Sequence, residues 1–311
     1  MQVFRGIPER ADQPSVLTIG NFDGVHRGHQ ALLSLLTEKA HVLGLPAAVL
    51  TFEPHPREYF SAADAPARLS SLREKLLLLA ASGVERAYVC RFNAAFAALS
   101  AENFIEDILV RGLGVRHLYI GDDFRFGARR RGDFAMLQAA GRAHGFGVES
   151  MATLDVAGER VSSSAVRAAL AKGELDHAAG LLGRPYSIAG RVAHGDKLGR
   201  QLGYPTANIQ LKHRRPALSG VFAVSVEGLL ASRSVQGVAN IGTRPTVDGS
   251  GRPRLEVHLF DWQQECYGAH LRVHFLHKLR QEQRFESFDA LTAQIRRDAD
   301  DARAWHAAHT N

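Results

Sequence analysis

The spacing of apolar residues changes once along the chain, and that change restricts the possible folds more than any other feature. In the first half, the extended apolar segments SVLTIG (15–20) and AAVLTF (47–52) flank QALLSLLTEKAHVLG (30–44), whose leucines recur at helical spacing. Helical and extended segments continue to alternate up to about residue 151. Repeated units of this length predict an α/β domain with an open, doubly wound parallel sheet, which binds ligands beyond the carboxyl ends of its strands.

After about residue 184 the apolar residues alternate at a period of two. Glycine, proline and aspartate turns separate the segments GVFAVSVEG, RLEVHLFDW and AHLRVHFLHK, which is typical of an antiparallel sheet or a small β-barrel. A helical pattern that begins near Ser287 closes the chain. Since glycine and proline interrupt the sequence where the period changes, we expect two domains, residues 1–184 and 185–311.

The composition is that of a soluble globular protein. Apolar residues make up 45% of the chain and charged residues 23%, and no apolar run reaches the length of a membrane span. Cys90 and Cys266 lie far apart without a metal-binding spacing, so we expect reduced cysteines and a cytoplasmic protein without a membrane partner. The formal net charge of +6 suits nucleic acid, phosphorylated small molecules or solubility alone, so charge does not decide the ligand class.

The turn GNFDGVHRGHQ carries the first candidate site, because it joins a predicted strand to a predicted helix. Such a turn directs backbone N–H groups and the positive end of the helix toward one spot, where phosphate binds. Glycines let the backbone come close to that ligand, and two imidazoles at His-x-Gly-His spacing can stabilise charge on a phosphoryl group. A pair of surface histidines is the alternative, and zinc is disfavoured because the turn supplies no third ligand. The residues concerned are Gly20, Gly24, His26, Gly28 and His29.

Two later segments add to this candidate site. VSSSAVRAAL places Ser163, Ser164 and Arg167 at the start of a helix, which suits a second contact with phosphates, although a serine N-cap explains the serines equally well. GDDFRFGARRRGD (121–133) follows a predicted strand, and its alternating aromatic and polar residues suit a planar ring as ligand. The arginines of that segment also fit a solvated loop or a nucleic-acid contact.

In this order, GNFDGVHRGH, FEPHP, GDDFRFG and SSSAVR resemble the FMN adenylyltransferase module of bacterial bifunctional riboflavin kinase/FAD synthetases, over about residues 15–184. The resemblance implies a Rossmann-like domain of the nucleotidylyltransferase type, in which the phosphate of FMN attacks the α-phosphorus of ATP and pyrophosphate leaves. It implies that His26 and His29 hold phosphates and stabilise the transition state. The other implied contacts are Ser163, Ser164 and Arg167 on the triphosphate, and Asn21 and Asp23 beside the nucleotide or a metal ion. We expect the planar ring that suits Asp123, Phe124 and Phe126 to be the flavin.

The segment GDKLGRQLGYPTANI carries the second candidate site. Its regularly spaced glycines expose backbone amides that suit phosphate, although a glycine-rich turn leading into a strand is the plainer explanation. The segment lacks the Gly-Lys-Ser/Thr ending of a Walker A loop, so a hydroxyl and an amide oxygen further on are the candidate ligands for Mg²⁺. The residues concerned are Gly195, Gly199 and Gly203 for phosphate, and Thr206 and Asn208 for the metal.

The predicted strand RLEVHLFDW supplies a candidate base. With Leu255, Val257 and Leu259 facing inward, Glu256 and His258 share the opposite face. A carboxylate there can take the proton from an alcohol that attacks the γ-phosphate of ATP. A plain solvent-exposed glutamate on a half-buried sheet is the alternative.

Residues 185–311 resemble the riboflavin kinase module of the same enzymes, in GRVAHGDKLGRQLGYPTANI, GVANIGTRPTV, LEVHLFDW and LHKLRQEQRFES. The resemblance implies a six-stranded Greek-key barrel with Thr206 and Asn208 on MgATP. It also implies that Glu256 is the general base toward the 5′-hydroxyl of riboflavin, that Arg280 lies near the flavin, and that Asn240 supports the site.

Together these motifs predict one chain with two activities, phosphorylation of riboflavin to FMN and adenylylation of FMN to FAD with release of pyrophosphate. ATP and Mg²⁺ serve both steps, and we expect small-molecule substrates, no nucleic-acid partner, and a monomer or weak oligomer. One alternative is a nucleotidylyltransferase for another phosphate, such as a pantetheine or nicotinate compound, with an unrelated barrel. The other is a nucleic-acid-binding protein that uses ARRRGD and KHRRP as basic patches.

Overall fold

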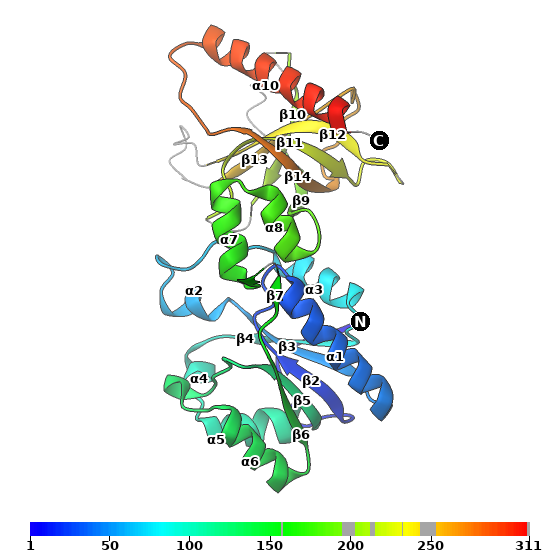
Figure 1. Cartoon of the computed structure of the whole chain (residues 1–311), viewed down its shortest axis with the longest axis vertical. Helices are drawn as coiled ribbons and strands as arrows, with labels where there is room; N and C mark the ends of the chain where they lie inside the picture. Colours follow the sequence, from blue (N-terminus) through cyan, green and yellow to red (C-terminus); the bar gives the residue numbers. More distant parts are fainter. Residues whose placement is uncertain (157, 195–202, 212–214, 232, 243–252, 310–311) are drawn as a thin grey trace. The chain divides into compact units, whose positions relative to one another are not determined.

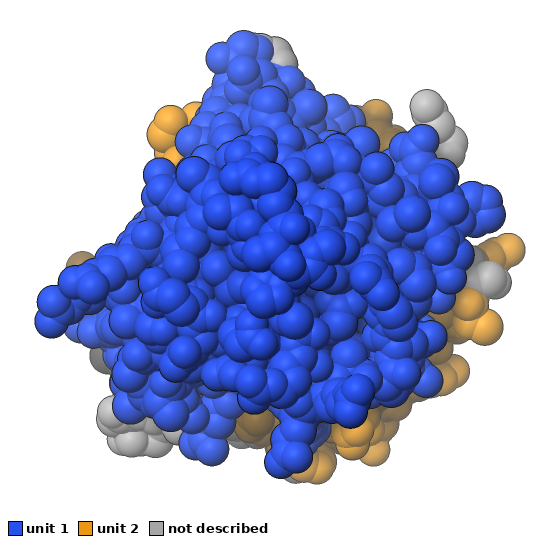
Figure 2. Space-filling model, turned by 90° about the horizontal axis from the view of Figure 1, so that it is seen from below, with its two compact units in different colours: residues 1–66, 72–162 blue, residues 67–71, 163–311 orange. Residues whose placement is uncertain are grey.

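The computed structural model of the chain describes residues 1–156, 158–194, 203–211, 215–231, 233–242 and 253–309 (Figure 1). The chain divides into two compact units, which Figure 2 colours separately. Unit 1 comprises residues 1–66 and 72–162, and unit 2 comprises residues 67–71 and 163–311. Helices α7 (Ser163–Lys172) and α8 (Leu175–Leu182) pack against each other within unit 2. The domain boundary near residue 184 therefore stays a prediction.

Unit 1 is built on a sheet of six parallel strands in the order β1-β4-β3-β2-β5-β6. From β2 the chain first adds strands on one side of the sheet and then returns to add β5 and β6 on the other side, which is the predicted doubly wound arrangement. The apolar pattern does not predict the edge strand β1. The strands are β1 (Gln2–Arg5), β2 (Ser15–Ile19), β3 (Ala47–Glu53), β4 (Arg86–Arg91), β5 (Val115–Gly121) and β6 (Gly147–Met151).

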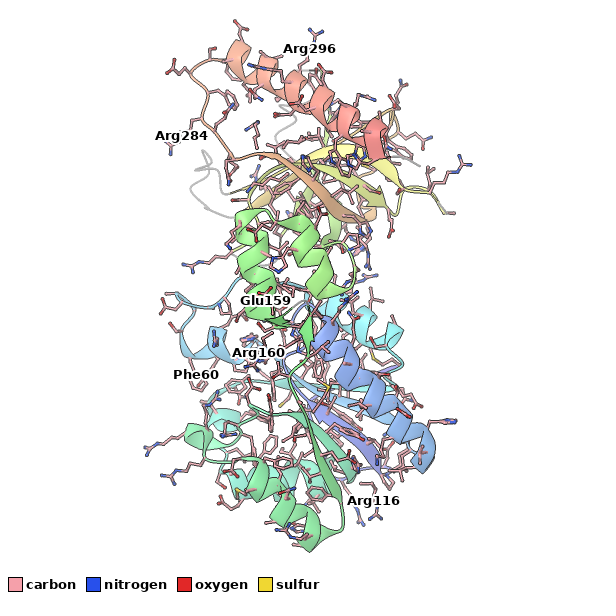
Figure 3. The ribbon with its side chains drawn as sticks, in the orientation of Figure 1. Phe60, Arg116, Glu159, Arg160, Arg284 and Arg296 are labelled. Atoms are coloured by element: carbon pink, nitrogen blue, oxygen red, sulfur yellow. The ribbon has the colours of Figure 1, made fainter. Side chains whose placement is uncertain are left out.

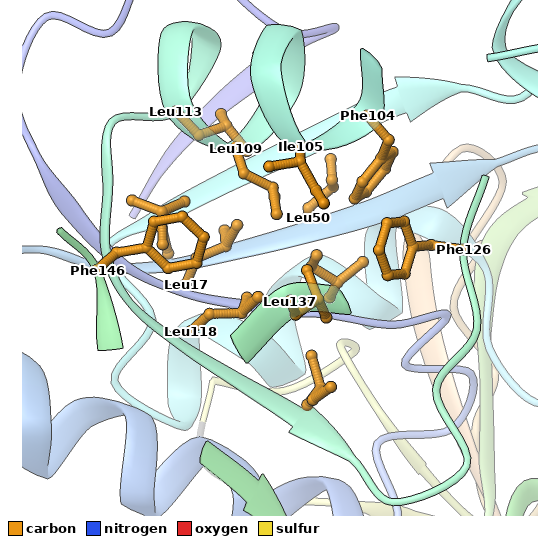
Figure 4. Close-up of a cluster of buried hydrophobic side chains, with 14 of the residues drawn as sticks. Leu17, Leu50, Phe104, Ile105, Leu109, Leu113, Leu118, Phe126, Leu137 and Phe146 are labelled. Atoms are coloured by element: carbon orange, nitrogen blue, oxygen red, sulfur yellow. The ribbon is translucent and has the colours of Figure 1, made fainter. Parts of the chain in front are cut away.

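Apolar clusters lie on both faces of this sheet, because its central strands are buried on both sides. On one face, Leu33 and Leu36 of α1 pack with Val49 of β3. On the other, Leu17 and Leu50 pack with side chains of η1 and α6 (Figure 4). The remaining elements are α1 (Arg27–Leu43), α2 (Pro56–Phe60), α3 (Leu72–Ala81), α4 (Ala94–Ala97), α5 (Ala101–Asn103), the π-type helix η1 (Phe104–Gly112), the short turn η2 (Ala128–Arg130), α6 (Phe134–His144), β7 (Asp155–Val156) and β8 (Glu159–Arg160).

Unit 2 contains a closed barrel of six antiparallel strands in the order β10-β13-β12-β11-β14-β9, which confirms the predicted barrel. Strand alternation places Phe222 and Phe275 inside, where their rings meet edge to face at 5.3 Å. The residues of opposite parity, such as Val221 and Val238, face outward and pack with Ala302 of α10 (Phe288–His309). The strands are β9 (Ser187–Ala193), β10 (Thr206–Gln210), β11 (Gly220–Glu227), β12 (Val235–Gly242), β13 (Arg254–Leu259) and β14 (His270–Arg280).

A charged pair fastens α10 to the barrel. Arg280, the last residue of β14, donates to both carboxylate oxygens of Asp298 on α10, at 2.7 and 2.6 Å. Only 5% of Asp298 is exposed. Since a buried carboxylate is costly without its partner, this two-point ion pair fixes the helix in one position along the barrel.

We expect Asp298→Ala to lower the free energy of unfolding of unit 2 by about 3 kcal/mol, because it leaves the Arg280 guanidinium without its anion. The exposed Asp300→Ala on the same helix is the control, with an expected change within about 0.5 kcal/mol. Both tryptophans, Trp262 and Trp305, lie in unit 2, so their fluorescence during urea unfolding reports on this unit. Equal stability of the two variants would show that the pair does not fasten the helix.

Candidate active sites

The first candidate site lies at one edge of the sheet in unit 1, where two loops leave neighbouring strands. β2 pairs in parallel with β5, so the chain leaves both strands at their common carboxyl edge. Because the strands that follow β2 and β5 lie on opposite sides of this pair, the edge is a topological switch point, where α/β proteins bind ligands. The turn with the two histidines follows β2, and the segment GDDFRFG begins at the end of β5.

His26 and His29 form a stacked pair at the start of α1. His26 is the N-cap residue of this helix, and its Nδ1 accepts a hydrogen bond from the backbone N–H of His29 at 3.3 Å. The two rings stack with their centroids 3.7 Å apart and their planes 18° from parallel. Since Nδ1 of His26 accepts this bond, the neutral ring carries its proton on Nε2, which can donate to an anion.

The environment of His29 favours an uncharged imidazole. Burial lowers the pKa of His29 well below its usual value, and the nearby His26 and Lys75 lower it further. Among the residues that the structure describes, its Nδ1 has no hydrogen-bond partner, and neither does the buried Oδ1 of Asn21 in the same turn. Two buried polar atoms without partners at one turn indicate a site that a ligand completes.

The turn reaches the helix through an unusual backbone path. Phe22, Gly24 and Val25 have φ values of 48°, 81° and 41°, in the left-handed region that Val in particular rarely adopts. Phe22 is fully buried, and its ring lies 4.9 Å from that of His29. A Cβ atom at Gly28 would lie 3.2 Å from Nδ1 of His26, so this position leaves the imidazole little room to move. A side chain at residue 28 would therefore press on the ring of His26.

The predicted triphosphate residues belong to unit 2. Ser163 and Ser164 begin α7, and Arg167 follows one turn later, as the sequence predicts. Nε of Arg167 donates to the carbonyl oxygen of Ala67 at 2.6 Å, which orients the guanidinium. Both residues of that bond lie in unit 2, so the contact of these residues with the phosphates at the histidine turn stays a prediction.

The two aromatic residues of the loop after β5 differ in burial. Phe126 is 5% exposed and packs in the core, with its ring 5.2 Å from that of Phe104. Phe124 is half-buried and stacks on Phe126 at 5.8 Å, while Asp123 forms an exposed ion pair with Arg160 at 3.1 Å. Phe124 and Asp123 are therefore the more accessible of the predicted flavin contacts, and Phe126 supports Phe124 from the core.

An aromatic cluster that the sequence patterns do not predict lies after β3 and β4. Tyr59 and Phe60 end α2, and their rings lie 5.5 and 5.6 Å from that of Phe92, which follows β4. Phe60 is 69% exposed (Figure 3), unusually high for a phenylalanine beside other aromatic rings. The consecutive aromatic residues after FEPHP are the signal that could have indicated this cluster.

The second candidate site is a row of polar side chains across three neighbouring strands of the barrel. In the strand register, Glu256 of β13 lies opposite Asn208 of β10 on one side and Asn240 of β12 on the other. All three are half-buried and alternate with fully buried residues such as Leu255 and Val257. Glu256 thus lies on the face opposite Leu255 and Val257, as the sequence predicts. The carboxamides of Asn208 and Asn240 flank its carboxylate.

His258 forms a hydrogen bond with the backbone just before β10. Its Nδ1 donates to the carbonyl oxygen of Pro205 at 2.9 Å, and burial lowers its pKa although this hydrogen bond acts in the opposite direction. Thr206, the residue after Pro205, lies opposite His258 in the register. Nδ2 of Asn208 donates to the carbonyl oxygen of Thr206 at 3.3 Å, so Oδ1 is the oxygen that would serve a cation. His258 therefore has a structural role beside the predicted site.

The segment after β14 adds a carboxylate that the sequence patterns do not predict. The carboxylate of Glu282 lies directly over Gly242, where a side chain would have no room. Gly242 is two residues after Asn240 on β12, so Glu282 lies on the same face as the polar row. The guanidinium of Arg280 is held by Asp298, which gives this residue a structural role at the base of the same segment. Gly203 has φ 82°, whereas Gly195 and Gly199 lie outside the described residues.

A histidine turn at a switch point and a barrel with a carboxylate between two carboxamides together are the arrangement expected of a two-part transferase that acts on phosphate compounds. Comparison with known proteins identifies the two parts. The family model described as FAD synthetase matches residues 9–165, and the one described as riboflavin kinase matches residues 182–306. The chain belongs to the family of bifunctional riboflavin kinase/FMN adenylyltransferases.

Individual relatives agree with these family models along nearly the whole chain. The bifunctional riboflavin kinase/FMN adenylyltransferase of Escherichia coli K12 is 53% identical over 96% of each chain. The enzyme of the same description from Pseudomonas fluorescens is 53% identical over 98% of this chain and 97% of its own.

A solved structure has the same overall fold under a different description. The crystal structure described as a macrolide-efflux protein from Streptococcus pneumoniae is 28% identical, covers 97% of this chain and 99% of its own, and superposes with a TM-score of 0.80. In the described part of our chain, no helix has the length and apolar character needed to cross a membrane.

We expect Gly28→Ala to slow adenylyl transfer to FMN about tenfold, because the new methyl group displaces the His26 ring from its stacked position. Gly180→Ala, in a helix of unit 2 where a Cβ meets no atom within 4 Å, is the matched control and should leave this rate unchanged. Initial rates of FAD formation from FMN and ATP measure the difference. Equal rates for both variants would mean that the position of His26 does not affect the reaction.

Proposed function

We propose that this chain makes FAD from riboflavin in two steps that occur at different sites. Riboflavin and ATP give FMN and ADP at the polar row of the barrel, and FMN and ATP then give FAD and pyrophosphate at the histidine turn. The observation that carries the proposal is the separation of two chemically different sets of residues. The stacked histidines begin α1 within the segment matched by FAD synthetase, and the row around Glu256 lies within the segment matched by riboflavin kinase.

In the adenylyl transfer, we assign charge stabilisation to the histidine turn. The FMN phosphate attacks the α-phosphorus of ATP, and negative charge grows on the phosphoryl oxygens and on the departing pyrophosphate. We assign hydrogen bonds to that charge to Nε2–H of His26, the uncharged His29 and the backbone N–H groups at the start of α1, which the bond to Nδ1 of His26 and the lowered pKa of His29 support. We assign Gly20, Gly24 and Gly28 to the close approach of the backbone, and Asn21 and Asp23 to the edge of the nucleotide.

For the triphosphate of ATP, we propose contacts with the start of α7. Ser163 and Ser164 supply hydroxyl groups at the helix start, and the guanidinium of Arg167 supplies positive charge. For the flavin, we propose Asp123 and Phe124 as direct contacts and Phe126 as support for Phe124, in line with the burial of these residues.

In the kinase step, we assign the general base to Glu256. Its carboxylate takes the proton from the 5′-hydroxyl of riboflavin as that oxygen attacks the γ-phosphorus of ATP, and the flanking carboxamides of Asn208 and Asn240 orient the reactants. The hydroxyl of Thr206 and Oδ1 of Asn208 are hard oxygen donors two residues apart on one strand face, a set that suits Mg²⁺. When bound there, Mg²⁺ neutralises charge on the ATP phosphates.

The remaining assignments of unit 2 concern phosphate and flavin. Gly195, Gly199 and Gly203 are proposed to present backbone N–H groups to ATP. We propose that Arg280 acts near the flavin by positioning the segment that carries Glu282, since its own guanidinium is held by Asp298. We further propose a cytoplasmic monomer or weak oligomer that acts on small molecules and needs neither nucleic acid nor a membrane.

Two substitutions test the separation of the sites. We expect His29→Ala to lower the rate of FAD formation from FMN on the order of 10²-fold and to leave FMN formation from riboflavin unchanged. We expect Glu256→Gln to lower FMN formation by roughly 10²–10⁴-fold and to leave FAD formation unchanged. Each step is measured separately by product chromatography with ATP and Mg²⁺.

Exposed residues of the same types serve as controls. His41→Ala on α1 and Glu286→Gln near the start of α10 should retain both activities. If either His29→Ala or Glu256→Gln removed both activities, the proposal of two separate sites would be wrong.

A further inference from the structure

A fully buried lysine lies behind the histidine turn. Lys75, on α3, is 1% exposed, and a buried ammonium group costs several kcal/mol unless nearby polar groups compensate for the lost water. Its Nζ donates to Oγ1 of Thr51 on β3 at 3.3 Å. Lysine therefore occupies a position where an apolar residue would fill the core between α3 and the sheet at lower cost.

The hydrogen bond from Lys75 continues to the turn itself. Oγ1 of Thr51, which is 0% exposed, donates to the backbone carbonyl oxygen of Asn21 at 3.2 Å. The next residue, Phe22, has the left-handed φ of 48° and places its ring 4.9 Å from that of His29. A continuous path of two hydrogen bonds and one aromatic contact thus joins Lys75 to a proposed phosphate-binding side chain.

The charge of Lys75 acts on the same side chain. Together with His26, the ammonium group contributes to the lowered pKa of His29, and so it helps to keep that imidazole uncharged. The positive charge of Lys75 would also attract a polyphosphate bound at the histidine turn, and low-dielectric surroundings strengthen such an attraction.

We propose that Lys75 is a positioning residue for adenylyl transfer. It holds the turn through Thr51 and supplies a fixed positive charge behind His29. This inference rests on the proposed function of the histidine turn.

Two substitutions of Thr51 test the hydrogen-bonded path. Thr51→Val replaces the hydroxyl by a methyl group, whereas Thr51→Ser removes the methyl group and keeps the hydroxyl. We expect Lys75→Met to lower kcat for FAD formation at least tenfold, with FMN formation unchanged. We expect Thr51→Val to lower kcat severalfold and Thr51→Ser to retain most of it. The double variant Lys75→Met with Thr51→Val should be no slower than Lys75→Met alone, because the two residues act along one path.

Leu109→Ala separates positioning from stability. Leu109 is 0% exposed on η1, in an apolar cluster that contains no residue of the histidine turn, so its truncation destabilises unit 1 without removing a packing partner of the turn. We expect this variant to have a lower Tm but an unchanged kcat at temperatures where it is folded. If Lys75→Met kept its kcat and lost only thermal stability, as Leu109→Ala does, or if its effect and that of Thr51→Val were additive, the inference would be overturned.

His29→Ala, assayed in parallel, distinguishes this inference from the proposed function. Full FAD formation by His29→Ala would overturn the function assigned to the turn. Loss of activity in His29→Ala with full activity in Lys75→Met would overturn only the role of the lysine.

Discussion

Parallel pairing of β2 with β3 on one side and with β5 on the other determines where the first site lies. β2 is buried along its whole length, and the chain reverses direction in residues 20–26, which join it to α1. The reversal passes through left-handed conformations at Phe22 and Val25, which cost about 1–3 kcal/mol each. Both side chains are 0–1% exposed, and their burial contributes about 1.5–3 kcal/mol each, which offsets that cost. The strained turn is thus stabilised by the core beneath it and presents the histidines at its end.

In the barrel of unit 2, the register of the strands determines where the second site lies. Alternation directs apolar side chains inward on β13 and leaves Glu256 on the outer face, between the carboxamides of β10 and β12. The ion pair between Arg280 and Asp298 holds α10 beside that face, and the absence of a side chain at Gly242 admits the carboxylate of Glu282. In both units a glycine therefore lies against an ionisable side chain of the site, in tight contact at Gly28 and without any room for a Cβ at Gly242.

The fold could be predicted from the sequence because each unit has a clear apolar period. Helical spacing in residues 30–44 and alternation in residues 254–262 both correspond to observed elements. The apolar pattern does not predict the short β1, since four residues of mixed character at an edge carry little periodic signal. The local motifs predicted the histidine turn and the position of Glu256, because neighbours in sequence create both.

Contacts between distant segments could not be predicted in the same way. Lys75 lies in a leucine-rich helical segment that reads as an ordinary amphipathic helix, and only the packing of α3 against β3 brings it to Thr51. Phe126 resembles an accessible ring in the sequence, yet the loop turns it into the core against Phe104. Glu282 reaches Gly242 only because β14 closes the barrel. These features depend on tertiary packing, for which neither period nor motif carries a signal.

The fate of the ATP phosphates tests the central claim of two successive transfers most directly. Riboflavin is incubated with the chain, Mg²⁺ and ATP that carries radioactive phosphorus at either the γ or the α position. We expect the γ label to appear in FMN and to remain in FAD, because the FMN phosphate is the attacking group of the second step. We expect the α label to appear in FAD and never in FMN. An α label in FMN, or a γ label in FMN that is absent from FAD, would contradict the account.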